Sequence, residues 1–185
     1  MTPGAQSDLW SFAVKVYGQP GVGERCLALQ DHHQLDANVL LFCCWLGRDG
    51  HVAAAVDWPS VVVETSRWQT LVVARLRRLR QRLKAASACS EPALRLRSEL
   101  LDCELRAETV ELAALPAWVA SPAGAGPELD AAQAAAHYLS AYCRALDVII
   151  EGDLEQALAQ LLARIYALSP AQACALVKSV ADRAS

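Results

Sequence analysis

The sequence predicts an all-α protein: a compact array of several helices, followed by an additional helical segment towards the C-terminus. Hydrophobic residues make up 54% of the 185 residues, and much of the excess is alanine and leucine rather than β-branched residues. Apolar residues also recur at three- and four-residue steps over most of the chain. One run, residues 61–63, suggests a strand, but it is short and lies within a helical pattern, so we expect helix there too.

Two helices are expected before residue 36. Ser7 or Asp8 can cap the first, which Gly18 ends. The second begins near Val22 and breaks within residues 32–35. Its apolar residues are expected to face the core: Val22, Cys26, Leu27 and Leu29.

A third helix, residues 37–46, is apolar on nearly every face, so we expect it at the centre of the fold. Asp36 precedes it and is an ordinary N-cap residue. The other helices are expected from Asp57 and Pro59, over 67–86, from Pro92 to Leu112, over 130–150, over 153–167, and from Ser169 and Pro170 onward.

The composition divides the chain into three parts. Residues 1–115 form the predicted main helical domain, and residues 116–127 are a Pro/Gly/Ala-rich linker. Residues 128–185 form the C-terminal helices, which either complete the same core or make a small second domain. The pattern leaves both arrangements open.

Charge and hydropathy exclude several classes of protein. The net charge of −3 gives no basic field for nucleic acid or anionic membranes. The N-terminus has no signal-peptide pattern, and the longest apolar run, residues 39–46, is too short to span a bilayer. We therefore expect a cytoplasmic protein. The seven cysteines form no CxxC pair and are expected to be reduced core residues.

A candidate ligand site lies where polar residues separate two apolar segments early in the chain. These residues are Gln30, Asp31, His32, His33, Asp36 and Asn38. Buried polar groups must be hydrogen-bonded, so the cluster either caps two helices or lines a site for a small polar ligand or a cation. The spacing fits no known metal motif, and the structural interpretation is favoured. No cofactor is predicted.

A second candidate surface is a basic helix whose cationic residues are Arg75, Arg77, Arg78, Arg80, Arg82 and Lys84. It could bind an acidic partner. The next predicted helix is acidic, so an antiparallel hairpin would pair and partly mask these charges. The leading functional hypothesis is a non-enzymatic interaction or regulatory protein with a protein partner, or a second copy of the chain. No strong catalytic motif is present.

Four of the five tryptophans lie in the first seventy residues: Trp10, Trp45, Trp58 and Trp68. Core packing is the favoured interpretation. Tryptophan is seldom fully buried, so the alternative is that one or more of them lines a groove.

Four blocks of sequence carry a resemblance: LWSFAVKVYGQPGV from Leu9, CLALQD from Cys26, LDANVLLFCCWL from Leu35 and WQTLVVARLRRLRQRLK from Trp68. In this order they resemble a family of small, uncharacterised proteobacterial proteins over residues 9–112. The resemblance implies no reaction or cofactor. The family pattern has glycine before Leu35, where this chain has Gln34, which weakens the argument for a tight glycine turn there.

Overall fold

A computed structural model describes residues 3–48, 55–87, 90–120 and 129–182. Within these ranges the regular secondary structure is helical apart from one isolated β-bridge, between Val56 and Val119, and turns or short irregular segments join the helices. The all-α prediction is confirmed, and residues 61–63 lie within a helix. No helix among the described residues is long and apolar enough to cross a membrane.

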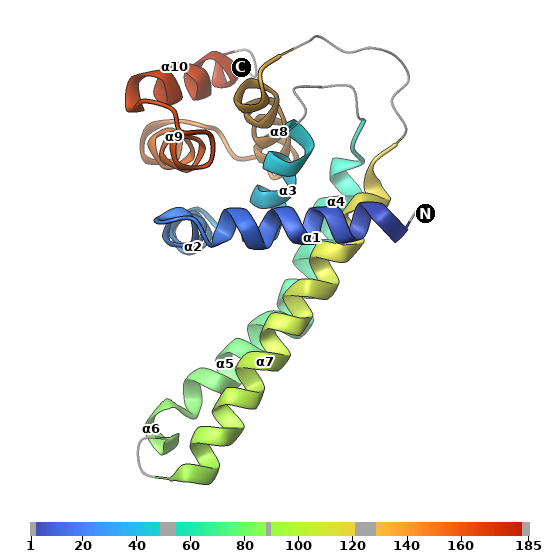
Figure 1. Ribbon diagram of the computed structural model, residues 1–185, viewed down its shortest axis with the longest axis vertical. Helices are drawn as coiled ribbons and strands as arrows, with labels where there is room; N and C mark the ends of the chain where they lie inside the picture. Colours follow the sequence, from blue (N-terminus) through green and yellow to red (C-terminus); the bar gives the residue numbers. More distant parts are fainter. Residues whose placement is uncertain (1–2, 49–54, 88–89, 121–128, 183–185) are drawn as a thin grey trace.

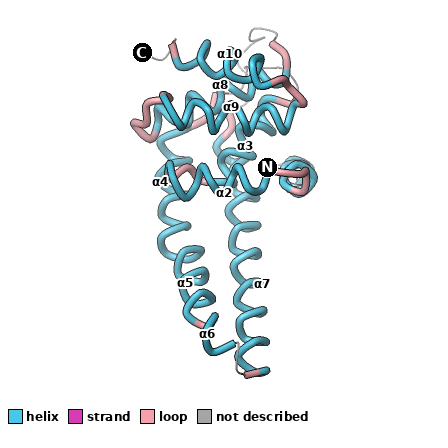
Figure 2. Tube along the Cα trace, turned by 90° about the vertical axis from the view of Figure 1, so that its left-hand side faces the viewer, coloured by secondary structure: helices cyan, strands magenta, loops and turns pink. Residues whose placement is uncertain are grey.

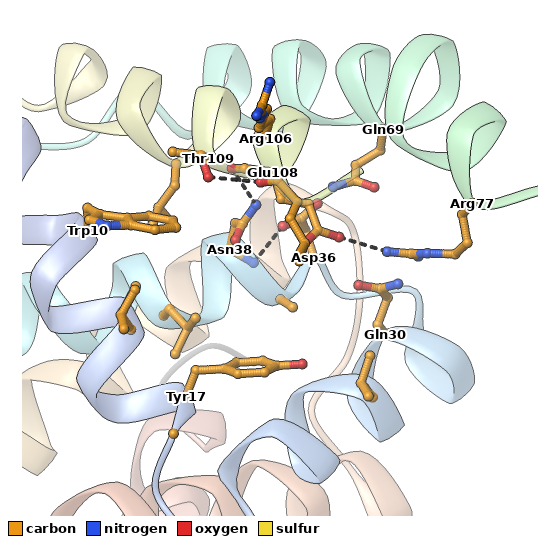
Figure 3. Close-up of a pocket in the computed structure, with 18 of the residues that line it drawn as sticks. Trp10, Tyr17, Gln30, Asp36, Asn38, Gln69, Arg77, Arg106, Glu108 and Thr109 are labelled. Carbon is orange, nitrogen blue, oxygen red and sulfur yellow. Dashed lines mark hydrogen bonds and ion pairs between the residues drawn. The ribbon is translucent and has the colours of Figure 1, made fainter. Parts of the chain in front are cut away.

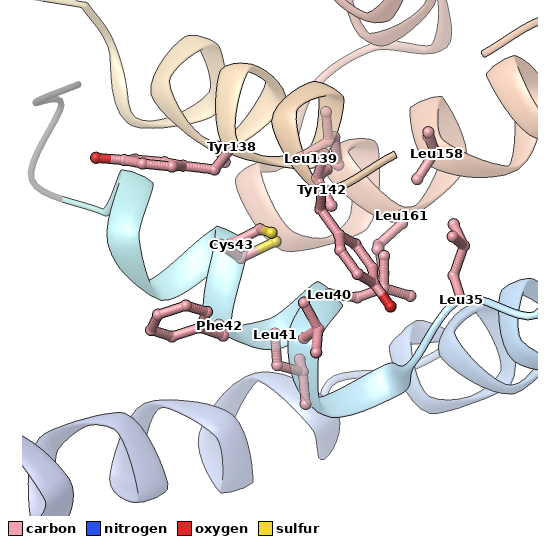
Figure 4. Packing of buried hydrophobic residues seen from close by; sticks show 14 of the residues in the cluster. Leu35, Leu40, Leu41, Phe42, Cys43, Tyr138, Leu139, Tyr142, Leu158 and Leu161 are labelled. Carbon is pink, nitrogen blue, oxygen red and sulfur yellow. The ribbon is translucent and has the colours of Figure 1, made fainter. Parts of the chain in front are cut away.

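Six helices form the body of the molecule (Figure 1). They are α1 (Pro3–Tyr17), α2 (Val22–His33), α3 (Ala37–Gly47), α8 (Ala131–Ala145), α9 (Gly152–Tyr166) and α10 (Pro170–Ala181). As predicted, α3 is central: its residues 39–44 are all buried, and it packs most extensively against α8 (Figure 4).

The other helices build a long hairpin. They are α4 (Trp58–Trp68), a π-helical segment (Gln69–Val73), α5 (Ala74–Arg82), α6 (Lys84–Ser87), α7 (Glu91–Ala114) and a 3-10 helix (Leu115–Trp118). Figure 2 shows α5 and α7 side by side, extending away from the body. We call α5, α6 and residues 91–104 of α7 the arm.

Predicted helix starts agree better with the structure than predicted helix ends. Asp36 and Asp57 cap α3 and α4 through hydrogen bonds from backbone amides, and Ser169 forms a capping box with Gln172. In contrast, α1 already begins at Pro3, before the predicted cap. The predicted helix over 67–86 is part of a run that is continuous from α4 to α5, because the π-helical segment joins them.

The predicted helix over 130–150 ends earlier, at Ala145. Leu146 leaves helical geometry and Asp147 has φ 55°, a left-handed conformation that stops the helix. Part of the predicted linker, residues 116–127, also has regular structure. Its first residues form the 3-10 helix, and Val119 pairs with Val56, whereas residues 121–128 lie outside the described part of the chain.

The C-terminal helices share a hydrophobic cluster with α1, α2 and α3. Two tyrosines connect them to α3. The Tyr142 hydroxyl of α8 accepts a hydrogen bond from the Asp36 amide (3.0 Å), and the Tyr166 hydroxyl of α9 donates one to the Cys44 carbonyl (3.0 Å). The core of the body is thus built from both ends of the chain.

The cysteines are only partly core residues. Cys26, Cys43, Cys44 and Cys143 are buried free thiols, and burial raises the pKa of Cys26 and of Cys143 to about 12. Cys103 and Cys174 are exposed, because each lies on the solvent-facing side of its helix, so the prediction is wrong for these two. Cys89 lies outside the described residues.

Candidate functional site

A cavity of about 770 Å³ lies between α1, α2, the first turns of α3, the π-helical segment and the C-terminal half of α7 (Figure 3). Cavities of this size are typical of sites for small organic ligands. One side of the cavity is apolar and the other is polar.

The apolar side is built mainly by α1, with contributions from α2, α3 and α7. The lining side chains here are Trp10, Ala13, Val14, Tyr17, Leu27, Leu41, Leu105 and Leu112. Leu41 and Leu112 are buried, whereas Trp10 is 45% exposed and forms part of the mouth. Leu27 is also 45% exposed, so the prediction that it faces the core is wrong: it faces this cavity.

The polar side begins at the N-terminus of α3. The Asp36 carboxylate accepts hydrogen bonds from the backbone amides of Asn38 (2.8 Å) and Val39 (3.2 Å), as an N-cap residue does. Burial raises the pKa of Asp36, although these amides, the Gln69 side chain and the charge of Arg77 oppose the shift. Asp36 is therefore a helix cap and part of the cavity wall at once.

Behind this wall, two side-chain amides converge on one buried carboxyl group. Glu111 of α7 is 4% exposed, and its Oε2 accepts hydrogen bonds from Asn38 (2.7 Å) and Gln69 (2.8 Å). Its Oε1 is buried without a partner. Burial and the nearby Asp36 raise the pKa of Glu111 to about 8, so the group is mainly protonated at neutral pH. Gln69 starts the π-helical segment, a type of distortion that is frequent at functional sites.

An ion-pair cluster closes the end of the cavity towards the arm. Arg77 donates to Glu104 (2.7 Å) and to Glu108 (2.9 Å), and Arg80 donates to Glu104 (2.6 Å). Burial alone would raise the pKa of Glu104, but the bonds from Arg80 and Arg77 hold it below its ordinary value. Glu108 has a single arginine partner, and burial raises its pKa.

The predicted ligand-site residues divide into two groups. Gln30, Asp36 and Asn38 line the cavity. Asp31 and His32 are exposed, and neither they nor His33 line it, because they lie on the other side of the last turn of α2. No group of three or more metal-ligating side chains occurs among the residues that the structure describes.

Gln34 follows His33 and ends α2 with φ 59°, in the left-handed region. The turn therefore has the geometry that glycine usually provides, so the lack of glycine at this position does not prevent it.

The predicted partner surface is also divided. Arg77 and Arg80 point at α7 and form ion pairs, as the hairpin prediction required, although Glu104 is far more buried than an exposed pair would be, with a side chain 5% exposed. The other basic residues of the helix are exposed: Arg75, Arg78, Arg82 and Lys84.

Of the four tryptophans, Trp10 lines the cavity, whereas Trp45 and Trp58 pack against the core. Trp68 donates its indole N–H to the Ala107 carbonyl (2.9 Å). The sequence pattern did not mark Tyr17, Gln69 or the acidic row of α7 as site residues. A signal existed for that row: Glu104, Glu108 and Glu111 recur at helical spacing on one face.

Residues 8–115 match the family described as "Protein of unknown function (DUF2390)". The match covers more than half of the chain, so the protein belongs to this family. Neither the curated proteins nor the solved structures include a match. The family span includes all the residues that line the cavity.

Proposed function

We propose that this protein is a non-enzymatic binding protein that takes up a small amphipathic organic molecule in the cavity between α1 and α7. The observation that carries the proposal is the combination of an open cavity of about 770 Å³ with exposed apolar side chains on one side and fixed polar groups on the other. Specific small-molecule sites have this composition.

A binding role is favoured over catalysis by the state of the polar groups. Among the residues that the structure describes, neither cysteine nor histidine lines the cavity. Asp36 is a helix cap, and Glu108 and Arg77 are bonded to each other, so no acid or base is held next to a nucleophile. The buried thiols elsewhere are kept protonated by their surroundings.

The proposal can be tested with N-phenyl-1-naphthylamine, a neutral dye that fluoresces in apolar sites. Val14 lies at the cavity mouth and is 53% exposed, so Val14→Trp should obstruct the entrance and weaken dye binding by about tenfold or more. Val63→Trp is the matched control, because Val63 is 61% exposed on α4 and lines none of the cavities described. Absence of dye binding to the wild type, or equal binding to both variants, would reject the proposal.

A protein partner bound by the arm is a second candidate function. Exposed arginines, among them Arg75 and Arg78, lie on the same helix as the exposed Leu79, a surface that suits an acidic amphipathic helix. Charge reversal at Arg75, Arg78 and Arg82 should abolish capture of such a partner, whereas Arg144→Glu on α8 should not. Arg77 and Arg80 are unsuitable for this test, because they hold α5 against α7.

A further inference from the structure

The polar side of the cavity holds more negative than positive charge. Three carboxylates line the cavity, Asp36, Asp102 and Glu108, against two guanidinium groups, Arg77 and Arg106. Directly behind the lining, Glu104 adds one carboxylate and Arg80 adds one guanidinium group, whereas Glu111 adds a carboxyl group that is mainly protonated at neutral pH. The excess of acid remains when the second layer is included.

The arginine closest to Asp36 is already engaged. Arg77 contacts Glu104 at 2.7 Å and Glu108 at 2.9 Å, so its charge is shared between two carboxylates. Asp36 has only amide partners for hydrogen bonding, and Glu111 likewise. Burial raises the pKa of Asp36, Glu108 and Glu111, which is the expected response of carboxyl groups that lack a full set of counter-charges.

The opposite side of the cavity offers two aromatic rings. In Figure 3, Trp10 and Tyr17 lie on the α1 side, across from Asp36, Gln30 and Arg77. The faces of aromatic rings attract cations, and the attraction is largest for organic ammonium groups in partly desolvated sites. Here the two rings face a wall that carries more carboxyl groups than guanidinium groups.

We propose that the cavity binds an organic cation, with its ammonium group between Asp36, Glu108 and the aromatic rings, and its apolar body along Leu27, Leu41 and Leu105. This inference rests on the proposed function and names the class of ligand. An anionic ligand of the same size would meet the excess of carboxylates. A neutral ligand would leave the excess of negative charge in the site without a counter-charge.

The test compares three probes with the same eight-carbon chain: octylammonium, octanol and octanoate. Isothermal titration of the full chain near pH 7.5 should give an affinity for octylammonium about tenfold or more above that for octanol. Octanoate should be the weakest ligand. The positive charge of octylammonium should favour the ionised form of Glu111, whose pKa is about 8, so its binding should also release protons, which titrations in buffers of different ionisation enthalpy detect.

Two variants identify the carboxylates responsible. Asp36→Asn keeps a good N-cap residue, and Glu108→Gln keeps the size of the side chain. Both should reduce the preference for octylammonium over octanol by about tenfold. Asp31→Asn is the matched control, because Asp31 is exposed in the same segment but outside the cavity. A preference that both variants retain would overturn the inference.

The outcomes separate this inference from the proposed function. Equal affinities for octylammonium and octanol, or a preference for octanoate, would overturn the cation inference and leave the binding function standing. If none of the three probes binds while the naphthylamine dye does, the cation inference is likewise overturned and the binding function stands. Failure of the dye as well would reject both.

Discussion

Helices α3 and α5 are of similar length, 11 and 9 residues, yet they are held in place in different ways. Most of α3 is buried, and it contacts helices from both ends of the chain. None of the residues of α5 is fully buried, and ion pairs to Glu104 fix its position against α7. Apolar packing therefore stabilises the body, whereas charge pairing sets the register of the arm.

The largest effect is expected where α3 and α8 touch. Gly47 is buried, and a Cβ added to it would lie 2.6 Å from the Cα of Ala135, which is backbone that cannot turn aside. Gly47→Ala should therefore cost more than about 3 kcal/mol in the free energy of unfolding by urea. Gly152→Ala is the control: it meets no atom within 4 Å and should cost about 1 kcal/mol, for its positive φ alone. Equal losses would contradict the packing argument.

A pair of leucine truncations compares the two regions directly. Leu40 of α3 is fully buried, and Leu40→Ala should cost about 3 kcal/mol because it leaves a void in the core. Leu101 of the arm is 40% exposed, and Leu101→Ala should cost less than about 1 kcal/mol. Thermal and urea unfolding measure both. A larger loss for the arm variant would show that the arm is covered in solution.

In the arm, the buried carboxylate should matter more than any leucine. Glu104→Gln replaces the acceptor that both Arg77 and Arg80 use, and should cost about 2 kcal/mol. Hydrogen exchange should locate the loss in α5 rather than in α3. Glu91→Gln removes an exposed pair with Arg95 on the same helix and should change stability by less than about 0.5 kcal/mol.

A gradual change in stability is expected from pH. The pKa of Glu111 is about 8 in the folded chain, above the ordinary value of 4.5, so the folded state holds a proton that the unfolded state releases. Its contribution is therefore fully present below about pH 4.5 and is lost as the pH rises towards 8. Glu111→Gln should remove this decline, on the order of 1 kcal/mol per pH unit. Parallel pH profiles for variant and wild type would contradict it.

The features that could be predicted are those that depend on residues close together in the sequence. Helix caps can be recognised in the sequence because the backbone amides that donate to a cap side chain belong to the next three residues; this applies to Asp36, Asp57 and Ser169. The central position of α3 was predictable because a helix that is apolar on all sides must be covered. The charge complementarity of α5 and α7 was also predictable, because each helix shows its basic or acidic pattern within its own sequence.

The cavity was only half predictable. Asp36 and Asn38 attract attention because they are polar between apolar segments, but their partner Glu111 lies more than seventy positions away. Nothing in α2 alone distinguishes Leu27, which faces the cavity, from Leu29, which is buried. His32 and His33 do not line the cavity, because adjacency in sequence does not place side chains on one face of a helix.

The packing of α3 against α8 has a consequence for synthesis of the chain. The family match ends at residue 115, but the helix that covers α3 begins at Ala131. When only the residues up to 115 have left the ribosome, the side of α3 that α8 covers in the folded protein is exposed to solvent and to chaperones. Folding of the body must wait until α8 has emerged.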